Sequence, residues 1–262
     1  MRNGLQKEMK IDQLKIEIYK TNKEMGEAAA EEAADAIKTA INSRKIANVM
    51  LATGNSQLSF LKKLREIKDI YWPAVNIFHL DEYLNLPFEH PASFSFFLNK
   101  NFLCYANVCA FFPVPGHPQD AEIACRGYEY LLKAHPIDVC CAGIGENGHL
   151  AFNEPTVANF KDPVWVKVVK LEEKSRQQQI NEGHFKSLKD VPTHAISVTI
   201  PGLLSAKKIL CIVPEKRKAR AVYSTLNEPI GPTFPASILR KTEYARLFLD
   251  KNSASEIIIS QK

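Results

Sequence analysis

Short apolar segments alternate along the chain with amphipathic or polar segments, and each type has the length of one strand or one helix. Continuous apolar runs of this kind are typical of parallel strands that are buried on both faces. They lie at residues 47–52, 75–80, 107–112, 137–144, 195–200, 209–213 and 244–250. The alternation predicts an α/β protein with one doubly wound domain over residues 1–262, a Rossmann-like three-layer fold with a mostly parallel sheet.

Less regular patterns fill the intervals between these runs. Residues 14–19 alternate polar with apolar side chains, which predicts an edge strand, and residues 165–171 alternate valine with lysine, as in a half-exposed strand. Helices are predicted at residues 21–43, 58–67, 94–102, 120–134 and 219–226. Residues 172–182 are polar without an apolar stripe, which is typical of either a solvated helix or a mobile cover over a site.

The composition mainly excludes certain classes of protein and of binding partner. The content of 45% hydrophobic and 24% charged residues is ordinary for a soluble globular protein. The net charge of +5 is dispersed along the chain, which argues against a nucleic-acid partner and suits an anionic small molecule. No apolar run reaches membrane-spanning length, and no signal peptide is recognisable. The six cysteines include no CxxC pair, so we expect reduced core residues in a cytoplasmic protein, with no metal site.

Candidate chemistry gathers where the predicted strands end. The run at residues 137–144 breaks at Gly145-Glu-Asn-Gly148 and is followed by an imidazole, His149, and a carboxylate, Glu154. Ligands of open α/β sheets bind at the carboxyl ends of strands, so these groups point to a catalytic site. Taken alone, this segment fits equally well a plain connection with an asparagine turn and a loop histidine.

The ends of two further predicted strands have features that could bind an anion. The run at residues 47–52 leads into Thr53-Gly-Asn-Ser56 and then a helix, where backbone N–H groups and two hydroxyls can hold a phosphate. The segment is neither a Walker loop nor a dinucleotide fingerprint, and it also fits a simple turn with a serine cap. The run at residues 209–213 leads into Pro214-Glu-Lys-Arg-Lys218, which either places Lys218 on a phosphate or forms a solvated basic turn.

The run at residues 75–80 ends in Asp81-Glu82-Tyr83. Two adjacent carboxylates are commonly a solvated loop, but one of them can face inward as a base while its neighbour is structural. The phenylalanines of residues 94–102 have no basic residues between them, so we interpret them as core packing and not as a stacking platform.

Together these segments resemble one family, the glucosamine-6-phosphate deaminases, within the larger group of sugar-phosphate isomerases and 6-phosphogluconolactonases. The resemblance rests on Leu51-Ala-Thr-Gly-Asn-Ser56, on Phe78-His-Leu-Asp-Glu-Tyr83, and above all on Gly143-Ile-Gly-Glu-Asn-Gly-His-Leu-Ala-Phe-Asn-Glu-Pro155. The third segment is the most specific, because the related lactonases share its Gly-His but usually lack its Phe-Asn-Glu-Pro.

The resemblance implies conversion of glucosamine 6-phosphate to fructose 6-phosphate and ammonia, without a metal or an organic cofactor. It implies that His149, oriented by Glu154, opens the sugar ring. Asp81 would then move a proton from C2 to C1, with Glu82 structural. Asn147 stands where many members have aspartate, so it can only orient His149 or a sugar hydroxyl. The residues implied to hold the phosphate are Thr53, Gly54, Asn55, Ser56 and Lys218.

One departure from the family concerns the phosphate site. Some members contact the phosphate with an arginine from an Asn-x-Arg-Phe-Phe segment, which has no match here, and Arg176 is the nearest candidate. The altered segment leaves galactosamine 6-phosphate open as the substrate. Two further functions compete with the deaminase, a 6-phosphogluconolactonase and a sugar-phosphate sensor without catalysis. Members of the family occur as monomers and as hexamers, so the resemblance also leaves a homo-oligomer open.

Overall fold

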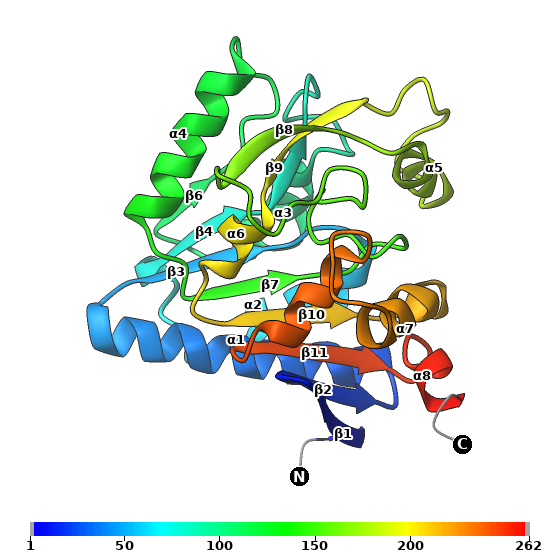
Figure 1. The fold of residues 1–262 in the computed structure, drawn as a ribbon. Coiled ribbons are helices and arrows are strands. Elements are labelled where there is room, and N and C mark those ends of the chain that lie inside the picture. The colour runs from blue at the N-terminus through cyan, green and yellow to red at the C-terminus, as the bar shows by residue number, and fades with distance from the viewer. Residues whose placement is uncertain (1–2, 260–262) are drawn as a thin grey trace.

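The computed structural model describes residues 3–259 and shows a central sheet between two groups of helices (Figure 1). The sheet has eight strands in the order β1-β2-β11-β10-β7-β3-β4-β6. Neighbouring strands are parallel throughout, except that β1 is antiparallel to β2. The predicted α/β fold with a mostly parallel sheet is therefore confirmed.

The strands of this sheet coincide closely with the apolar runs. They are β1 (Leu5–Ile11), β2 (Leu14–Tyr19), β3 (Ala47–Leu51), β4 (Val75–His79), β6 (Ala110–Phe112), β7 (Val139–Ala142), β10 (Ile209–Val213) and β11 (Ala245–Asp250). The central strands β3, β4, β7 and β10 are buried at every position, which explains their mainly apolar sequences. The edge position predicted for residues 14–19 is wrong, because β1 pairs with the outer side of β2.

The helices separate into two layers. Helices α1 (Asn22–Arg44), α2 (Leu58–Glu66) and α3 (Phe94–Asn101) pack against one face of the sheet. Helices α4 (Ala121–Ala134), α6 (Ile200–Leu204), α7 (Ala219–Asn227) and α8 (Ser255–Ile259) pack on the other side. Within β10, Leu210 and Ile212 belong to the core on the side of α1, α2 and α3. Ile209, Cys211 and Val213 belong to the core on the opposite side of the sheet. Alternate residues of one strand thus supply both cores.

The cysteines follow this layering only in part. Four of them are buried free thiols, as expected, namely Cys125, Cys140, Cys141 and Cys211. The core position expected for Cys104 and Cys109 is wrong, because both are exposed. These two lie in the connection between α3 and β6, where the chain runs over the surface before it enters the edge strand.

A second, antiparallel sheet stands beside the main one. The strands predicted at residues 165–171 and 195–200 belong to it, but the sequence patterns do not predict that they pair in a separate sheet. It has the strand order β5-β9-β8, from β5 (Asp81–Tyr83), β9 (His194–Val198) and β8 (Val166–Lys170). Helix α5 (Glu173–Asn181) follows β8. Because β5 follows β4 almost directly, Asp81 lies at the junction of the two sheets, where it pairs with Ser197 of β9.

The strand order brings the chemically interesting loops together. Strands β10, β7, β3 and β4 are adjacent and parallel, so their carboxyl ends meet at one edge of the sheet. The chain proceeds from β3 to β4 on one side and from β7 to β10 on the other. The boundary between β3 and β7 is therefore a topological switch point, where such folds bind ligands. Within residues 3–259, no helix is both long and apolar enough to span a membrane.

Candidate active site

A cavity opens at this edge of the sheet, and most of the predicted site residues line it. The lining includes Thr53, Gly54, Asn55, Ser56, Asp81, His149 and Lys218. The opposite wall comes from α5 and the residues after it, which contribute Ser175, Gln178, Gln179, Glu182 and His184. The polar segment at residues 172–182 is thus a cover over the cavity, which explains why it has no apolar stripe.

The predicted phosphate loop, residues 53–56, has the backbone that an anion site needs. Gly54 has a φ of 96°, and a Cβ built on it would meet nothing within 4 Å, so its backbone borders open space. The buried Gln57 ties this loop to β10, because its side-chain amide donates to the Ile212 carbonyl at 3.1 Å and to Ser56 Oγ at 3.2 Å. Burial, and then the neighbouring Arg217, lower the pKa of Lys218 to about 8. A bound phosphate would favour its charged form.

We expect Gly54→Ala to weaken binding of a sugar phosphate by about tenfold or more, because the methyl group enters the space left for the phosphate. The positive φ should also cost about 1 kcal/mol or more of stability. Inhibition by inorganic phosphate measures the first effect and urea unfolding the second. Gly127→Ala is the matched control, since Gly127 lies in α4 with open space around it and no positive φ. Equal phosphate affinity in both variants would contradict the prediction.

The adjacent carboxylates Asp81 and Glu82 have different environments. Glu82 accepts hydrogen bonds from the backbone N–H groups of Tyr83, Phe94 and Ser95 at 3.0, 3.0 and 2.9 Å. It also accepts one from the Ser93 hydroxyl at 2.9 Å, so it anchors the start of α3 and is structural, as expected. Asp81 instead lines the cavity and is 7% exposed. Burial and the charge of Glu82 raise the pKa of Asp81 well above its usual range.

His149 is held in one tautomer by Asn147. The Asn147 amide nitrogen donates to Glu172 Oε2 at 3.1 Å, which turns its carbonyl oxygen toward His149 Nδ1 at 2.6 Å. Nδ1 therefore carries the proton, and Nε2 is left as the basic nitrogen. Burial, and then the charge of Lys218, lower the pKa of His149 to about 3. A Cβ on Gly145 would come within 2.1 Å of the imidazole, so this ring position requires glycine there.

Glu154, which was predicted to orient His149, does not contact it directly. Glu154 is fully buried outside the cavity lining, and its Oε2 accepts the backbone N–H of Glu172 at 2.5 Å. Glu172 in turn holds Asn147, which contacts the imidazole. The influence of Glu154 on His149 thus passes through two other residues. Burial raises the pKa of Glu154 to about 7.

Arg176 does not line the cavity, which contradicts the prediction that it binds the phosphate. Its guanidinium donates to the backbone carbonyls of Leu188 and Val191, so it supports the segment that follows α5. Its neighbour Ser175 does belong to the lining. The helical turn of α5 places the two side chains on different faces.

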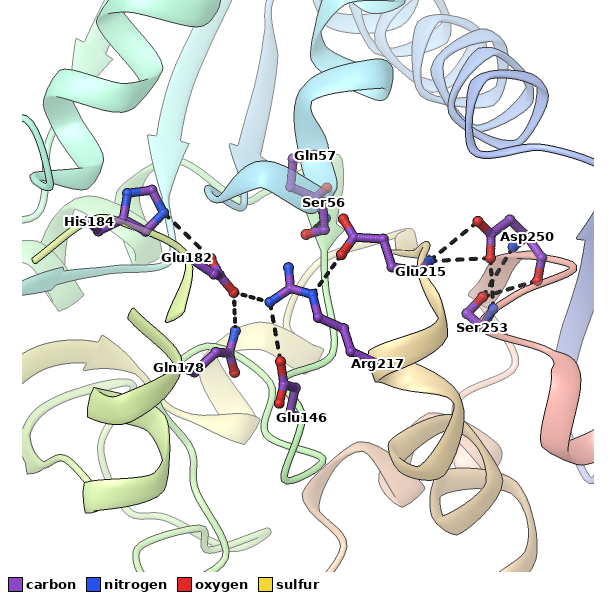
Figure 2. Close-up of polar contacts among 10 residues, drawn as sticks. All are labelled: Ser56, Gln57, Glu146, Gln178, Glu182, His184, Glu215, Arg217, Asp250 and Ser253. Atoms are coloured by element: carbon purple, nitrogen blue, oxygen red, sulfur yellow. Dashed lines mark hydrogen bonds and ion pairs between the residues drawn. The ribbon is translucent and has the colours of Figure 1, made fainter. Parts of the chain in front are cut away.

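Several lining residues were not predicted from the sequence. Phe94 and Phe97 border the cavity, although we interpreted the aromatic residues of α3 as core, whereas Phe102 is fully buried as expected. Arg217 also lines the cavity and pairs with Glu182 of the cover (Figure 2). The basic turn at residues 214–218 could have indicated from the sequence that Arg217 belongs to the site. No local pattern identifies its partner Glu182, which lies 35 residues earlier in the chain.

In the described part of the chain, no group of three or more His, Cys, Asp or Glu side chains is arranged to hold a metal ion. The cavity itself combines an anion site, a neutral imidazole and a buried carboxyl group. This set of side chains is suited to acid–base catalysis on a phosphorylated small molecule.

Comparisons with known proteins agree with this geometry. The profile of the family described as glucosamine-6-phosphate isomerases/6-phosphogluconolactonase matches residues 20–248. A glucosamine-6-phosphate deaminase of Clostridium botulinum (strain Eklund 17B / Type B) is 37% identical over 232 residues, which cover 86% of this chain and 91% of that protein. A glucosamine-6-phosphate deaminase of Bacillus thuringiensis (strain Al Hakam) is 32% identical, with 92% and 88% covered.

Solved structures show the same relationship. A monomeric glucosamine-6-phosphate deaminase superposes with a TM-score of 0.84 at 31% identity, covering 94% of this chain and 99% of the other. A 6-phosphogluconolactonase from Shewanella baltica OS155 superposes with a TM-score of 0.76 at 17% identity, covering 92% and 100%, and shares the fold. The chain belongs to the family of glucosamine-6-phosphate isomerases and 6-phosphogluconolactonases.

Proposed function

We propose that this protein is a glucosamine-6-phosphate deaminase, which converts glucosamine 6-phosphate and water to fructose 6-phosphate and ammonia. The observation that carries the proposal is that Asp81 and His149 line the same cavity as the phosphate loop. A lactonase needs no base for a carbon-bound proton, whereas this reaction requires one. The named deaminase relatives support the same assignment.

Substrate binding begins with the phosphate. The backbone N–H groups and hydroxyls of residues 53–56 hold its oxygens, and Lys218 contributes a positive charge. Because the phosphate is attached at the opposite end of the sugar from the reacting carbons, its binding energy fixes C1 and C2 relative to the catalytic side chains.

His149 opens the sugar ring. Its Nε2, unprotonated because Asn147 accepts the proton of Nδ1, takes the proton of the anomeric hydroxyl and delivers it to the ring oxygen. The lowered pKa keeps the imidazole neutral over the physiological range, so the lone pair of Nε2 is free. A bound phosphate would offset the charge of Lys218, which is one cause of the lowered pKa, and would therefore raise the basicity of Nε2. The open-chain aldehyde that results has an acidic hydrogen at C2.

Asp81 then transfers the proton from C2 to C1. Removal of the C2 hydrogen forms a C1–C2 double bond while the aldehyde oxygen O1 takes a proton from the ammonium group at C2. Return of the first proton to C1 then leaves a hydroxymethyl group at C1 and an iminium ion at C2. Water hydrolyses this iminium ion to the ketone and releases ammonia as ammonium, which balances the reaction. Burial favours the protonated form of Asp81, whereas the ammonium group of the amino sugar favours the carboxylate that must act as the base.

The direct test is to incubate the purified protein separately with glucosamine 6-phosphate, galactosamine 6-phosphate and 6-phosphogluconolactone. We expect equal amounts of ammonia and fructose 6-phosphate from the first compound. Ammonia from galactosamine 6-phosphate alone would establish the isomeric substrate instead. Hydrolysis of the lactone without ammonia would establish a lactonase, and binding without turnover would establish a sensor.

We also infer that the protein acts in the cytoplasm, because Cys125, Cys140, Cys141 and Cys211 are buried free thiols, as is typical of a reducing compartment. A homo-oligomer stays a prediction, and the solved deaminase relative is named as monomeric. Sedimentation of the purified protein at two concentrations distinguishes a monomer from a reversible oligomer.

A further inference from the structure

The positive charge available to a phosphate is limited in this cavity. Among the described residues of its lining, Lys218 and the adjacent Arg217 are the lysine and arginine side chains present. A phosphate monoester carries between one and a half and two negative charges near neutral pH, on the order of the value for a phosphorylated side chain. Lys218 supplies at most one positive charge. A second cation in the same lining would bring the positive charge of the site closer to the charge of the phosphate.

One guanidinium nitrogen of Arg217 is not used in its contacts with glutamate side chains. Its Nε donates to Glu215 at 2.6 Å, and its Nη1 donates to Glu146 at 3.2 Å and to Glu182. Its Nη2 makes no hydrogen bond to any residue in the part of the chain that the structure describes. In the view of Figure 2 this nitrogen points toward Ser56, and Arg217 and Ser56 both line the cavity. An unoccupied pair of N–H donors in this lining can bind a phosphate oxygen.

The same guanidinium is connected to the cover. Glu182 is the C-cap residue directly after α5, and its side chain is 9% exposed. It also pairs with His184 at 3.5 Å and accepts from Gln178 at 2.6 Å. The next aromatic residue, Phe185, packs against the rings of Tyr83 and His90. These contacts hold the end of the cover against the cavity wall, and the pairing with Arg217 joins it to the phosphate side.

We propose that Arg217 is the second cation for the substrate phosphate and that it couples phosphate binding to the position of the cover. Nη2 donates to a phosphate oxygen beside Lys218, while Nη1 keeps its contact with Glu182. The bound phosphate and the docked cover then stabilise each other through one side chain. The identity of the ligand as a hexose 6-phosphate rests on the proposed function.

Binding of fructose 6-phosphate, measured by calorimetry with unphosphorylated fructose as the reference, tests this role without any turnover. We expect Arg217→Met to weaken fructose 6-phosphate binding by about 10- to 100-fold, in the range of one charge-assisted hydrogen bond. Arg217→Lys, which keeps the charge but loses the second donor group, should lie between the wild type and Arg217→Met. Affinity within about twofold of the wild type in Arg217→Met would overturn the proposal.

Arg220→Met is the matched control. Arg220 lies in α7 with a side chain that is 67% exposed, a 4.0 Å contact to Glu256 and a cation–π contact with the ring of Tyr223, so removing it takes away the same charge three residues further along. We expect its affinity for fructose 6-phosphate to equal that of the wild type. An equal loss in Arg220→Met would show a general charge effect and would contradict the proposal. Thermal unfolding of each variant verifies that it is folded.

Loss of Arg217 also leaves three carboxylates without their cation, and their repulsion of the phosphate must be separated from loss of the contact. The double variant Arg217→Met/Glu182→Gln removes one of these charges, the one nearest the cover. Persistently weak binding in the double variant supports a direct contact, whereas recovery to wild-type affinity would overturn it. Limited proteolysis after residue 172 should be slowed by fructose 6-phosphate in the wild type and in Arg220→Met, but not in Arg217→Met.

These outcomes separate the role of Arg217 from the proposed reaction. A wild type that binds fructose 6-phosphate but releases no ammonia would contradict the deaminase assignment and leave Arg217 to be judged by its own variants. A wild type that releases ammonia, with unchanged binding in Arg217→Met, would overturn the role of Arg217 alone. A wild type that binds no hexose 6-phosphate would overturn both.

Discussion

Asp81→Asn is expected to reduce ammonia release from glucosamine 6-phosphate by about 100- to 10,000-fold, because an amide cannot take the proton from C2. Affinity for fructose 6-phosphate should be unchanged, since Asp81 is the first residue of β5 and is not among the residues proposed to hold the phosphate. Steady-state assays of ammonia and calorimetry of fructose 6-phosphate measure the two effects. Loss of binding together with loss of activity would show that Asp81 holds the ligand and would contradict its role as the base.

The same substitution should not destabilise the protein. The raised pKa of Asp81 means that its ionised form is unfavourable in the folded state. The folded protein therefore binds more protons than the unfolded chain above the usual pKa of about 3.9, and this group lowers stability as the pH rises from there. Asparagine removes that penalty, so the stability advantage of Asp81→Asn should be greater at about pH 7 than at about pH 4.5 in urea unfolding.

Glu82→Gln provides the contrast for this stability measurement. Glu82 accepts from four donors, and the amide nitrogen of glutamine would meet some of them as another donor. We expect a loss of about 1–3 kcal/mol, the penalty for leaving a buried donor unsatisfied. A destabilised Asp81→Asn beside an unaffected Glu82→Gln would reverse the roles that the structure assigns to the two carboxyl groups.

His149→Gln is expected to produce the other large loss of activity, again about 100- to 10,000-fold, because glutamine cannot shuttle the proton of ring opening. His149 also affects stability, with the opposite sign to Asp81. Its pKa is lowered to about 3, so between there and the usual value of about 6.5 the unfolded chain binds more protons than the folded protein. Stability contributed by the neutral imidazole is therefore lost as the pH falls through this window.

Urea unfolding at about pH 4.5 and pH 7 tests this effect directly. His149→Gln should lose less stability between pH 7 and pH 4.5 than the wild type does. His117→Gln is the control, because His117 is exposed in a loop outside the cavity lining. A wild-type pH dependence retained in His149→Gln would contradict the neutral, buried state of the imidazole.

Local sequence patterns are sufficient to locate the strands of the main sheet and the loops of the site. Parallel strands buried on both faces are mainly apolar, so β3, β4, β7 and β10 are visible as apolar runs that are interrupted only by Asn48, Asn76 and His79. Polar side chains placed directly after such runs then predict a site at the carboxyl edge of the sheet. For this reason Asp81, His149 and residues 53–56 can be assigned to one site from the sequence, and all of them line the cavity.

Which side chains meet across the cavity depends instead on tertiary packing. Asn147 orients His149 because Glu172, a residue 25 positions later, turns its amide, and Glu154 acts through Glu172. The separation of Arg176 from the cavity and the pairing of Arg217 with Glu182 likewise depend on how α5 lies over the sheet. Sequence patterns report the period and burial of one element at a time, whereas these contacts depend on the relative placement of several elements.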